Sequence, residues 1–222
     1  MKSIILEKIL RSSLELFVKK GIREISVHDI VKSANISTRT FYRYFKSKEM
    51  VIDYIITSGI KKNKLALQMV TKEIKNPIDA YVIFISTTYP GIKNMSNQFF
   101  MDLVKYFPKQ FEQLNNFVFK DITAFYIDNI RKGKKMGLYR KEINENLCAY
   151  YIVESVFNSL YKLFLNSKEF SKEFVYLEIR RIISFGMLTK KGIIKFNESS
   201  KNYFPELTDM KLPVNQPPGK KQ

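Results

Sequence analysis

The chain has 222 residues, enough for one large domain or for a small domain followed by a larger one. Hydrophobic residues make up 45% of it, so it can bury a substantial core and is not a disordered chain. Lys and Arg number 38 against 21 Asp and Glu, a formal net charge of +17, which favours a polyanionic partner: DNA, RNA or an anionic membrane surface.

Cysteine usage and hydropathy narrow the setting. The single cysteine, Cys148, excludes an internal disulfide and a CxxC metal or redox site, and we interpret it as a small buried apolar residue. Every apolar run is shorter than the roughly 18 residues of a membrane span. Glu7 and Lys8 interrupt the apolar N-terminus, which makes it a poor signal-peptide core. We therefore expect a cytoplasmic protein without a membrane-spanning segment.

The N-terminal quarter predicts short helices with clear start and stop residues. A first helix over about 3–19 ends at two lysines and Gly21, as helices commonly do. Ser26 is the expected N-cap of a second helix, whose buried stripe is Val27, Ile30, Val31 and Ala34. Asn35 tolerates the left-handed turn that follows it. Ser37 then caps a third helix, from Thr38 to about Tyr44, and Ser47 caps a fourth.

The third helix has two faces of different chemistry. Phe41 and Phe45, four residues apart, can pack on the two helices before them. The opposite face carries Thr38, Arg39, Tyr42 and Arg43. The first 64 residues also hold 14 Lys and Arg against 6 Asp and Glu, a higher positive density than in the other 158, which hold 24 against 15. Two short helices joined by a tight turn, with an exposed basic face on the second, predict a helix-turn-helix that enters the DNA major groove.

The rest of the chain predicts longer helices rich in Phe and Tyr. We expect them at about 78–88, 95–106, 108–132, 144–166 and 169–187, with a loop at 133–137. We find neither an internal repeat nor a strand pattern, so the fold class is all-α. The predicted division is a helix-turn-helix domain over 1–48, a helical ligand-binding and dimerisation domain over 49–196, and a flexible, polar tail over 197–222.

The run from Ile9 to Glu49 resembles the DNA-binding domain of the tetracycline-repressor (TetR) family of bacterial regulators. The matching residues are Leu16-Phe17, Gly21, Ser26-Val27, Asp29-Ile30 and the unbroken run Ile36-Ser37-Thr38-Arg39-Thr40-Phe41-Tyr42-Arg43-Tyr44-Phe45-Lys46-Ser47-Lys48-Glu49. Asn35 stands where the family usually has glycine, and Arg39 where Gly or Pro is common. Because a long cation at position 39 alters base preference, no operator of the family is carried over to this chain.

The chemistry of the side chains divides the expected DNA contacts. The forks of Arg39 and Arg43 match guanine O6 and N7, and Thr38 is a weaker base reader. Phosphate contacts suit Thr40, Tyr42, Tyr44 and Lys48, beside the free backbone N–H groups of the fourth helix. The resemblance also suggests DNA contact for His28, on the outer side of the second helix. The full predicted DNA-binding set is Ser26, His28, Ser37, Thr38, Arg39, Thr40, Tyr42, Arg43, Tyr44 and Lys48.

The resemblance implies that the second domain binds a small molecule and dimerises through its last two helices. Aromatic residues crowd 99–126 and can line an apolar pocket, for which we select Phe100, Val104, Phe107 and Phe125. The helices at 144–166 and 169–187 are apolar on most sides, which suits burial against a twin chain or an intramolecular core alone. The predicted dimer residues are Val153, Phe157, Leu160, Phe164, Phe174 and Leu177.

The predicted function is that of a dimeric, sequence-specific transcription regulator, a repressor released from an inverted-repeat DNA operator by a largely apolar ligand. An enzyme is disfavoured because the sequence has no GxGxxG, P-loop, HExxH or GxSxG motif and one histidine; neither a cofactor nor a metal is expected. A sequence-tolerant structural DNA-binding protein without a ligand stays open as the alternative. Membrane-surface binding is disfavoured because the basic residues do not line an amphipathic stripe.

Overall fold

The computed structural model describes residues 2–161 and 171–208, and it confirms the all-α prediction: this part of the chain contains helices and no strand. The first elements are α1 (Lys2–Lys20), α2 (Val27–Ala34), α3 (Thr38–Tyr42), α4 (Lys48–Glu73), α5 (Pro77–Asn94) and α6 (Asn97–Tyr106). Then follow α7 (Pro108–Asn116), the π-helical turn η1 (Phe117–Ile122), α8 (Thr123–Lys135), α9 (Glu145–Tyr161), α10 (Lys172–Met187), α11 (Lys190–Tyr203) and the 3-10 turn η3 (Pro205–Leu207). No helix within these ranges is long and apolar enough to span a membrane.

The short N-terminal helices begin where the capping residues predict. The Ser26 side chain accepts a hydrogen bond from the Asp29 N–H, and the Asp29 carboxylate accepts one from the Ser26 N–H, which completes a capping box. The Ser37 and Ser47 side chains cap α3 and α4 by accepting from the N–H groups of Thr40 and Met50. Between α2 and α3, Asn35 adopts the left-handed conformation with φ 51°. Local side-chain hydrogen bonds therefore fix the ends of these helices.

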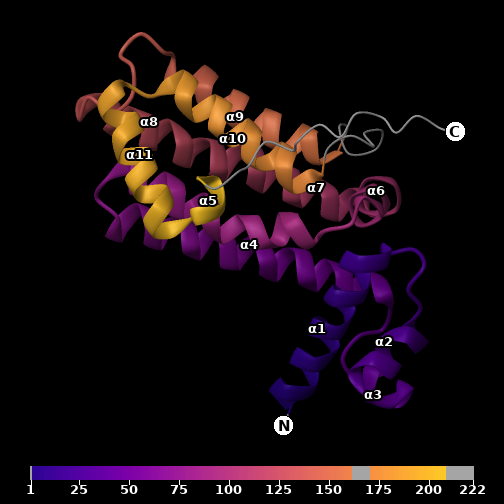
Figure 1. The fold of residues 1–222 in the computed structure, drawn as a ribbon. Helices are drawn as coiled ribbons and strands as arrows, with labels where there is room; N and C mark the ends of the chain where they lie inside the picture. The colour runs from indigo at the N-terminus through magenta and orange to yellow at the C-terminus, as the bar shows by residue number, and fades with distance from the viewer. Residues whose placement is uncertain (1, 162–170, 209–222) are drawn as a thin grey trace, which may run out of the picture.

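Two apolar cores lie at the two ends of the molecule (Figure 1). The smaller one joins α1–α3 and the start of α4 to α6, with Phe41 and Ile9 fully buried in it. The larger one fills the bundle formed by α5, α8, α9, α10 and α11. The α4 helix leads from the small unit along the bundle, so the predicted boundary between residues 48 and 49 falls inside the first turn of one continuous helix.

The segment predicted as one helix over 108–132 forms three consecutive elements, α7, η1 and α8, and ends later than predicted. The π-helical turn η1 separates α7 from α8, and α8 continues to Lys135 through the residues that we expected to form a loop. The loop prediction was wrong because Gly133 serves close packing rather than a turn. A Cβ there would lie 2.2 Å from the Tyr139 ring, so only glycine lets that ring approach the helix. The turn itself is at Gly137, with φ +70°.

The predicted start of the C-terminal tail, residue 197, lies too early in the chain. Residues up to Tyr203 belong to α11, and Pro205 opens the η3 turn. Phe204 and Leu207 are buried in the large core, and the Ser199 hydroxyl donates to the Asp79 carboxylate. The polar composition misled the prediction because these few apolar side chains suffice to dock the segment. The rest of the predicted tail, 209–222, lies outside the described residues.

Candidate nucleic-acid interface and small-molecule site

The outer face of α3 is open to solvent and rests on a rigid base. Thr38, Arg39, Tyr42 and Arg43 are exposed, with 53% of Tyr42 accessible. Beneath them Phe41 is fully buried and packs against Phe45, with ring centroids 6.1 Å apart. The helix can therefore present two guanidinium groups and a phenol without exposing its apolar side. Lys46 is also exposed just beyond α3.

The two capping serines of this unit use their hydroxyls within the protein. The Ser26 hydroxyl donates to Asp29 at 2.5 Å, and the Ser37 hydroxyl lies 2.8 Å from the Thr40 hydroxyl. Hydrogen bonds from Ser26 hold the pKa of Asp29 below its ordinary value. Thr40 and Tyr44 are half-buried, whereas His28 is exposed on α2. Ser26 and Ser37 thus order the helix ends, and both stay at the surface.

Lys48 forms hydrogen bonds within the protein. Its ammonium donates to three backbone carbonyls of the α1–α2 loop: Ile22 at 2.9 Å, Arg23 at 3.3 Å and Ile25 at 2.8 Å. An ammonium has three N–H donors, so none is left for a phosphate in this arrangement. These bonds make Lys48 a link between α4 and the loop, and its predicted phosphate contact stays a prediction. The sequence could not show this, since the fold alone brings the carbonyls to residue 48.

A second set of hydrogen bonds, which the sequence did not let us predict, joins the N-terminal unit to α6. The Asp102 side chain is buried and accepts from the Arg23 N–H at 2.7 Å and from the Gln98 amide at 2.6 Å. Gly21, at φ +88°, lets α6 approach, because a Cβ there would lie 2.8 Å from the Asp102 carboxylate. The Arg23 guanidinium also donates to the Tyr106 hydroxyl at 3.0 Å. One signal was available: Asp102 interrupts the apolar face of Phe99 and Leu103.

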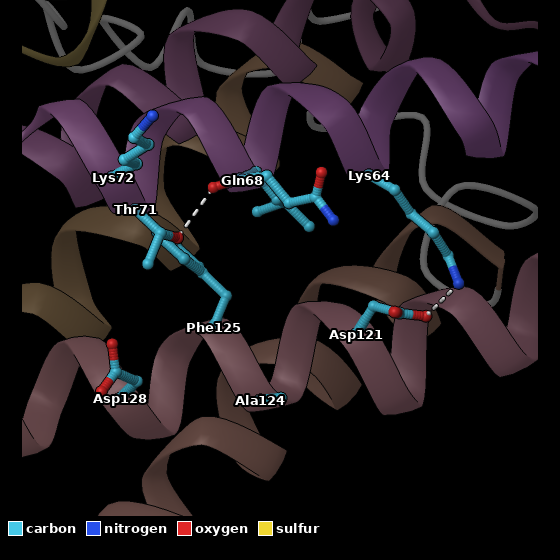
Figure 2. Close-up of a pocket in the computed structure, with 9 residues that line it drawn as sticks. Lys64, Gln68, Thr71, Lys72, Asp121, Ala124, Phe125 and Asp128 are labelled. Atoms are coloured by element: carbon cyan, nitrogen blue, oxygen red, sulfur yellow. Dashed lines mark hydrogen bonds and ion pairs between the residues drawn. The ribbon is translucent and has the colours of Figure 1, made fainter.

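A hollow of about 430 Å³ lies between α4 and α8 (Figure 2). Figure 2 shows polar side chains reaching into it from both helices, with an ion pair of 3.0 Å between Lys64 and Asp121 at one end. Its lining residues are Lys64, Leu67, Gln68, Thr71, Lys72, Asp121, Ala124, Phe125 and Asp128. A second hollow of about 410 Å³ extends along α4 from the same ion pair and is lined partly by η1.

Only one of the four predicted ligand contacts lines these hollows. Phe125 lines the first. Phe100 is buried against Phe111 and Phe157, Phe107 belongs to the small core, and Val104 is half-buried on α6. The structure does not bring the four together, because α6 turns toward the DNA-binding unit. The polar lining residues on α4 went unpredicted, since nothing in a helix of mixed charge shows which side faces a neighbour.

The predicted dimer residues divide between the interior and the undescribed part of the chain. Val153 and Leu177 are buried in the large core, and Phe157 packs within the protomer against Phe111 and Phe119. The burial of Val153 and Leu177 argues against a surface role for these two, which the sequence could not show because helices apolar on most sides do not reveal which side faces inward. Phe157 is half-buried, so its dimer role stays a prediction. Phe174 is half-buried. Leu160 lies in the last turn of α9, but its side chain, like all of Phe164, lies outside the described residues.

Other large apolar side chains on α9 and α10 face solvent. The exposed fraction is 69% for Leu147 and 61% for Tyr151 on α9, and 63% for Ile182 on α10. Tyr150 is half-exposed beside Phe119. These side chains leave apolar area of α9 and α10 exposed to solvent on the protomer.

Comparison with known proteins agrees with this architecture. The family profile described as bacterial regulatory proteins, tetR family, matches residues 9–55. Among curated relatives, the HTH-type regulator YuxN of Bacillus subtilis is 26% identical over 140 residues, 61% of this chain and 48% of YuxN. The HTH-type transcriptional repressor KstR2 of Mycolicibacterium smegmatis is 20% identical over 159 residues, 69% of this chain and 77% of KstR2. The chain thus spans about half the length of YuxN. These relatives are named as regulators, not as enzymes.

Two solved structures share the fold over most of both chains. A gamma-butyrolactone receptor, ArpA-like, superposes with a TM-score of 0.64 at 11% identity, covering 92% of this chain and 96% of its own. SmeT, the repressor of the Stenotrophomonas maltophilia multidrug efflux pump SmeDEF, gives a TM-score of 0.63 at 13% identity, covering 83% and 91%. At such identities the likeness concerns the arrangement of helices alone.

Proposed function

We propose that this chain, which belongs to the TetR family of bacterial regulatory proteins, represses transcription as a homodimer that a small molecule releases from its operator. The observation that carries the proposal is the exposed α3 face, where Arg39 and Arg43 stand over a buried aromatic base. Two of the proteins it resembles, KstR2 and SmeT, are named as repressors. We propose a cytoplasmic location, because the DNA of a bacterial cell lies in the cytoplasm.

The proposed contacts follow from exposure and donor chemistry. Arg39 and Arg43 read guanine through bidentate hydrogen bonds, and Thr38 adds a weaker base contact. Tyr42, Thr40, Tyr44 and His28 contact phosphate or sugar, while Ser26 and Ser37 act through the helix ends that they order. Lys48 and Asp102 orient the N-terminal unit through their hydrogen bonds to the α1–α2 loop. Two copies related by a two-fold axis then read an inverted repeat whose half-sites are roughly 34–36 Å apart or a multiple of that distance.

The proposed dimer forms through the outer face of α9 and α10. Leu147, Tyr151 and Ile182 expose apolar area there that a second copy would bury. Symmetric pairs are the commonest oligomers, and a two-fold pair places one α3 on each side of its axis. The division of the chain follows the two cores, with α4 shared between them.

The proposed response to a ligand runs through α4. This helix forms one wall of both hollows and also carries Lys48, which holds the α1–α2 loop. A ligand that moves α4 against α8 therefore changes the orientation of α3. Coupling of roughly 1–3 kcal/mol between ligand and operator is typical, and operator DNA must change ligand affinity by the same factor.

Selection of bound duplexes from a random DNA pool tests the function. We expect an inverted repeat to emerge, and a scrambled duplex of equal length to compete at least about 10³-fold more weakly at physiological salt. If random DNA competes as well as the selected site, the protein is a sequence-tolerant DNA-binding protein instead. Light scattering of the free protein tests the dimer separately.

A further inference from the structure

The C-terminal bundle buries a cation that has no counterion among the described residues. Arg180 on α10 is 4% exposed. Its guanidinium donates to the Tyr126 hydroxyl at 2.8 Å and lies over the rings of Tyr126 and Tyr176, 5.8 Å and 5.2 Å from their centroids. The ion pairs of the described chain leave it out, and the nearest acidic residues of α10 are engaged elsewhere: Glu173 with Lys93, and Glu178 with Arg181.

The surrounding hydroxyls cannot supply the missing charge. Burial raises the pKa of Tyr126 well above its ordinary value, although the adjacent Arg180 opposes this, so the phenol is neutral at physiological pH. The rings attract the cation through their faces but carry no net charge. Taking a charge out of water is strongly unfavourable unless the charge is paired, so an arginine in this position calls for an anion.

One nitrogen of the guanidinium and one neighbouring hydroxyl are buried without a hydrogen-bond partner. They are the Arg180 Nε and the hydroxyl of Tyr176, one turn away on the same face of α10. Tyr176 is fully buried. Nearby, the Ser184 hydroxyl donates to the Arg180 backbone carbonyl at 2.6 Å and lies 3.1 Å from the Tyr81 hydroxyl, from which it can accept. Most buried polar groups in proteins are paired. Two unpaired donors, one of them on an uncompensated cation, therefore lack the same kind of partner: a negatively charged hydrogen-bond acceptor.

We propose that Arg180 and Tyr176 bind a single anionic group inside the bundle, such as the carboxylate of a small organic effector. The guanidinium supplies charge and the Nε–H donor, and the Tyr176 hydroxyl supplies a second hydrogen bond. Aromatic side chains would contact the body of the effector: Phe125, which lines the hollow beside α4, packs on Tyr126 with ring centroids 5.3 Å apart. This inference rests on the proposed function, because it names the chemical class of the small molecule. A free inorganic anion has the same chemistry and is a separate arm of the test.

The test is an anion titration of the full-length protein without DNA, followed by thermal unfolding and calorimetry. The probes are sodium benzoate and sodium octanoate, their neutral counterparts benzyl alcohol and 1-octanol, and sodium formate and sodium chloride. We expect a saturable rise in the unfolding midpoint with carboxylates and none with the alcohols. A rise with chloride or formate alone identifies an inorganic or minimal anion as the occupant.

Arg180→Met should abolish the response, lowering anion affinity at least ~10-fold, the usual effect of losing a hydrogen bond to a charged group. Arg181→Met is the matched control: it removes the same charge one residue away, from a half-exposed side chain, and should respond like the unaltered protein. An equal response in all three proteins, or no saturable response to any anion in the unaltered protein, overturns the proposal.

A tyrosine pair keeps the test decisive if Arg180→Met fails to fold. Tyr176→Phe removes a hydroxyl that has no partner, so it should weaken anion binding several-fold and leave the midpoint unchanged without ligand. Tyr139→Phe removes an equally buried hydroxyl that donates to Asn129 at 2.9 Å, so it should lower the midpoint and leave anion affinity unchanged. The reverse pattern contradicts the proposal. Because no DNA is present, loss of operator selection would overturn the proposed function without altering this result.

Discussion

The N-terminal unit and the C-terminal bundle differ in what they bury. The core of the small unit is made of Ile, Val, Phe and Leu, with Ser13 and Asp102 as buried polar residues, and its arginines Arg39 and Arg43 lie outside on α3. In the bundle, four of the largest fully buried side chains are tyrosines, at 81, 126, 139 and 176, accompanied by Asn129, Arg180 and Ser184. An apolar core gives a rigid support for the exposed face of α3 that carries Thr38, Arg39, Tyr42 and Arg43, which we call the reading surface. A polar interior can instead respond to the chemistry of a bound molecule.

The largest expected effect comes from disrupting the small apolar core on which the reading surface of α3 rests. Phe41→Ala leaves a cavity in the small core and should lower the free energy of unfolding by about 3–5 kcal/mol. The next residue is the control: Tyr42 is exposed, so Tyr42→Ala should change stability by no more than about 0.5 kcal/mol while it weakens DNA binding. Urea denaturation of the two variants checks this contrast. Similar losses of stability would mean that α3 does not divide into a packed and a reading face.

Asp102 tests the contact between the two regions. Asp102→Ala leaves the Arg23 N–H and the Gln98 amide without their acceptor and should cost roughly 1–3 kcal/mol of stability. Operator affinity should also fall, because α6 no longer holds the α1–α2 loop. Asp128→Ala is the control, since it removes a half-exposed carboxylate whose ion pair is with Lys132 on its own helix, far from the α1–α2 loop in sequence. Equal operator affinity in both variants would show that α4 alone orients the unit.

Lys48 tests whether a cation near the interface acts on DNA or on the protein. Lys48→Met leaves three loop carbonyls without their donor and should destabilise the fold by roughly 1–3 kcal/mol. It should also weaken binding to all DNA sequences, with the slope of log affinity against log salt unchanged. Lys46→Met removes an exposed cation instead, and it should leave stability unchanged. A salt slope reduced by about one unit per protomer in Lys48→Met would support the phosphate contact.

The sequence predicted best those features that depend on neighbours along the chain. Ser26, Ser37 and Ser47 cap helices because each hydroxyl reaches the N–H three residues further on, and Phe41 is buried by helical periodicity. Features that depend on distant segments were not predictable. The carbonyl partners of Lys48, the close approach at Gly133 and the inward side of α9 are all created by tertiary packing. The polar residues of the hollow belong to the same class, because two helices distant in the chain supply them.

The smallest effect on the fold is expected from Arg39, which tests the reading surface alone. Its side chain is exposed on α3, so Arg39→Ala should leave the free energy of unfolding within about 0.5 kcal/mol. On the selected operator it should cost about 1–3 kcal/mol of binding and relax the choice at one base pair in each half-site, because a bidentate contact to guanine is lost. Titration of the variant against the operator and a scrambled duplex, at several salt concentrations, separates the two kinds of contact. An equal loss of affinity for both duplexes would make Arg39 a phosphate contact. Base discrimination would then rest on Arg43, which lies on the same exposed face four residues later.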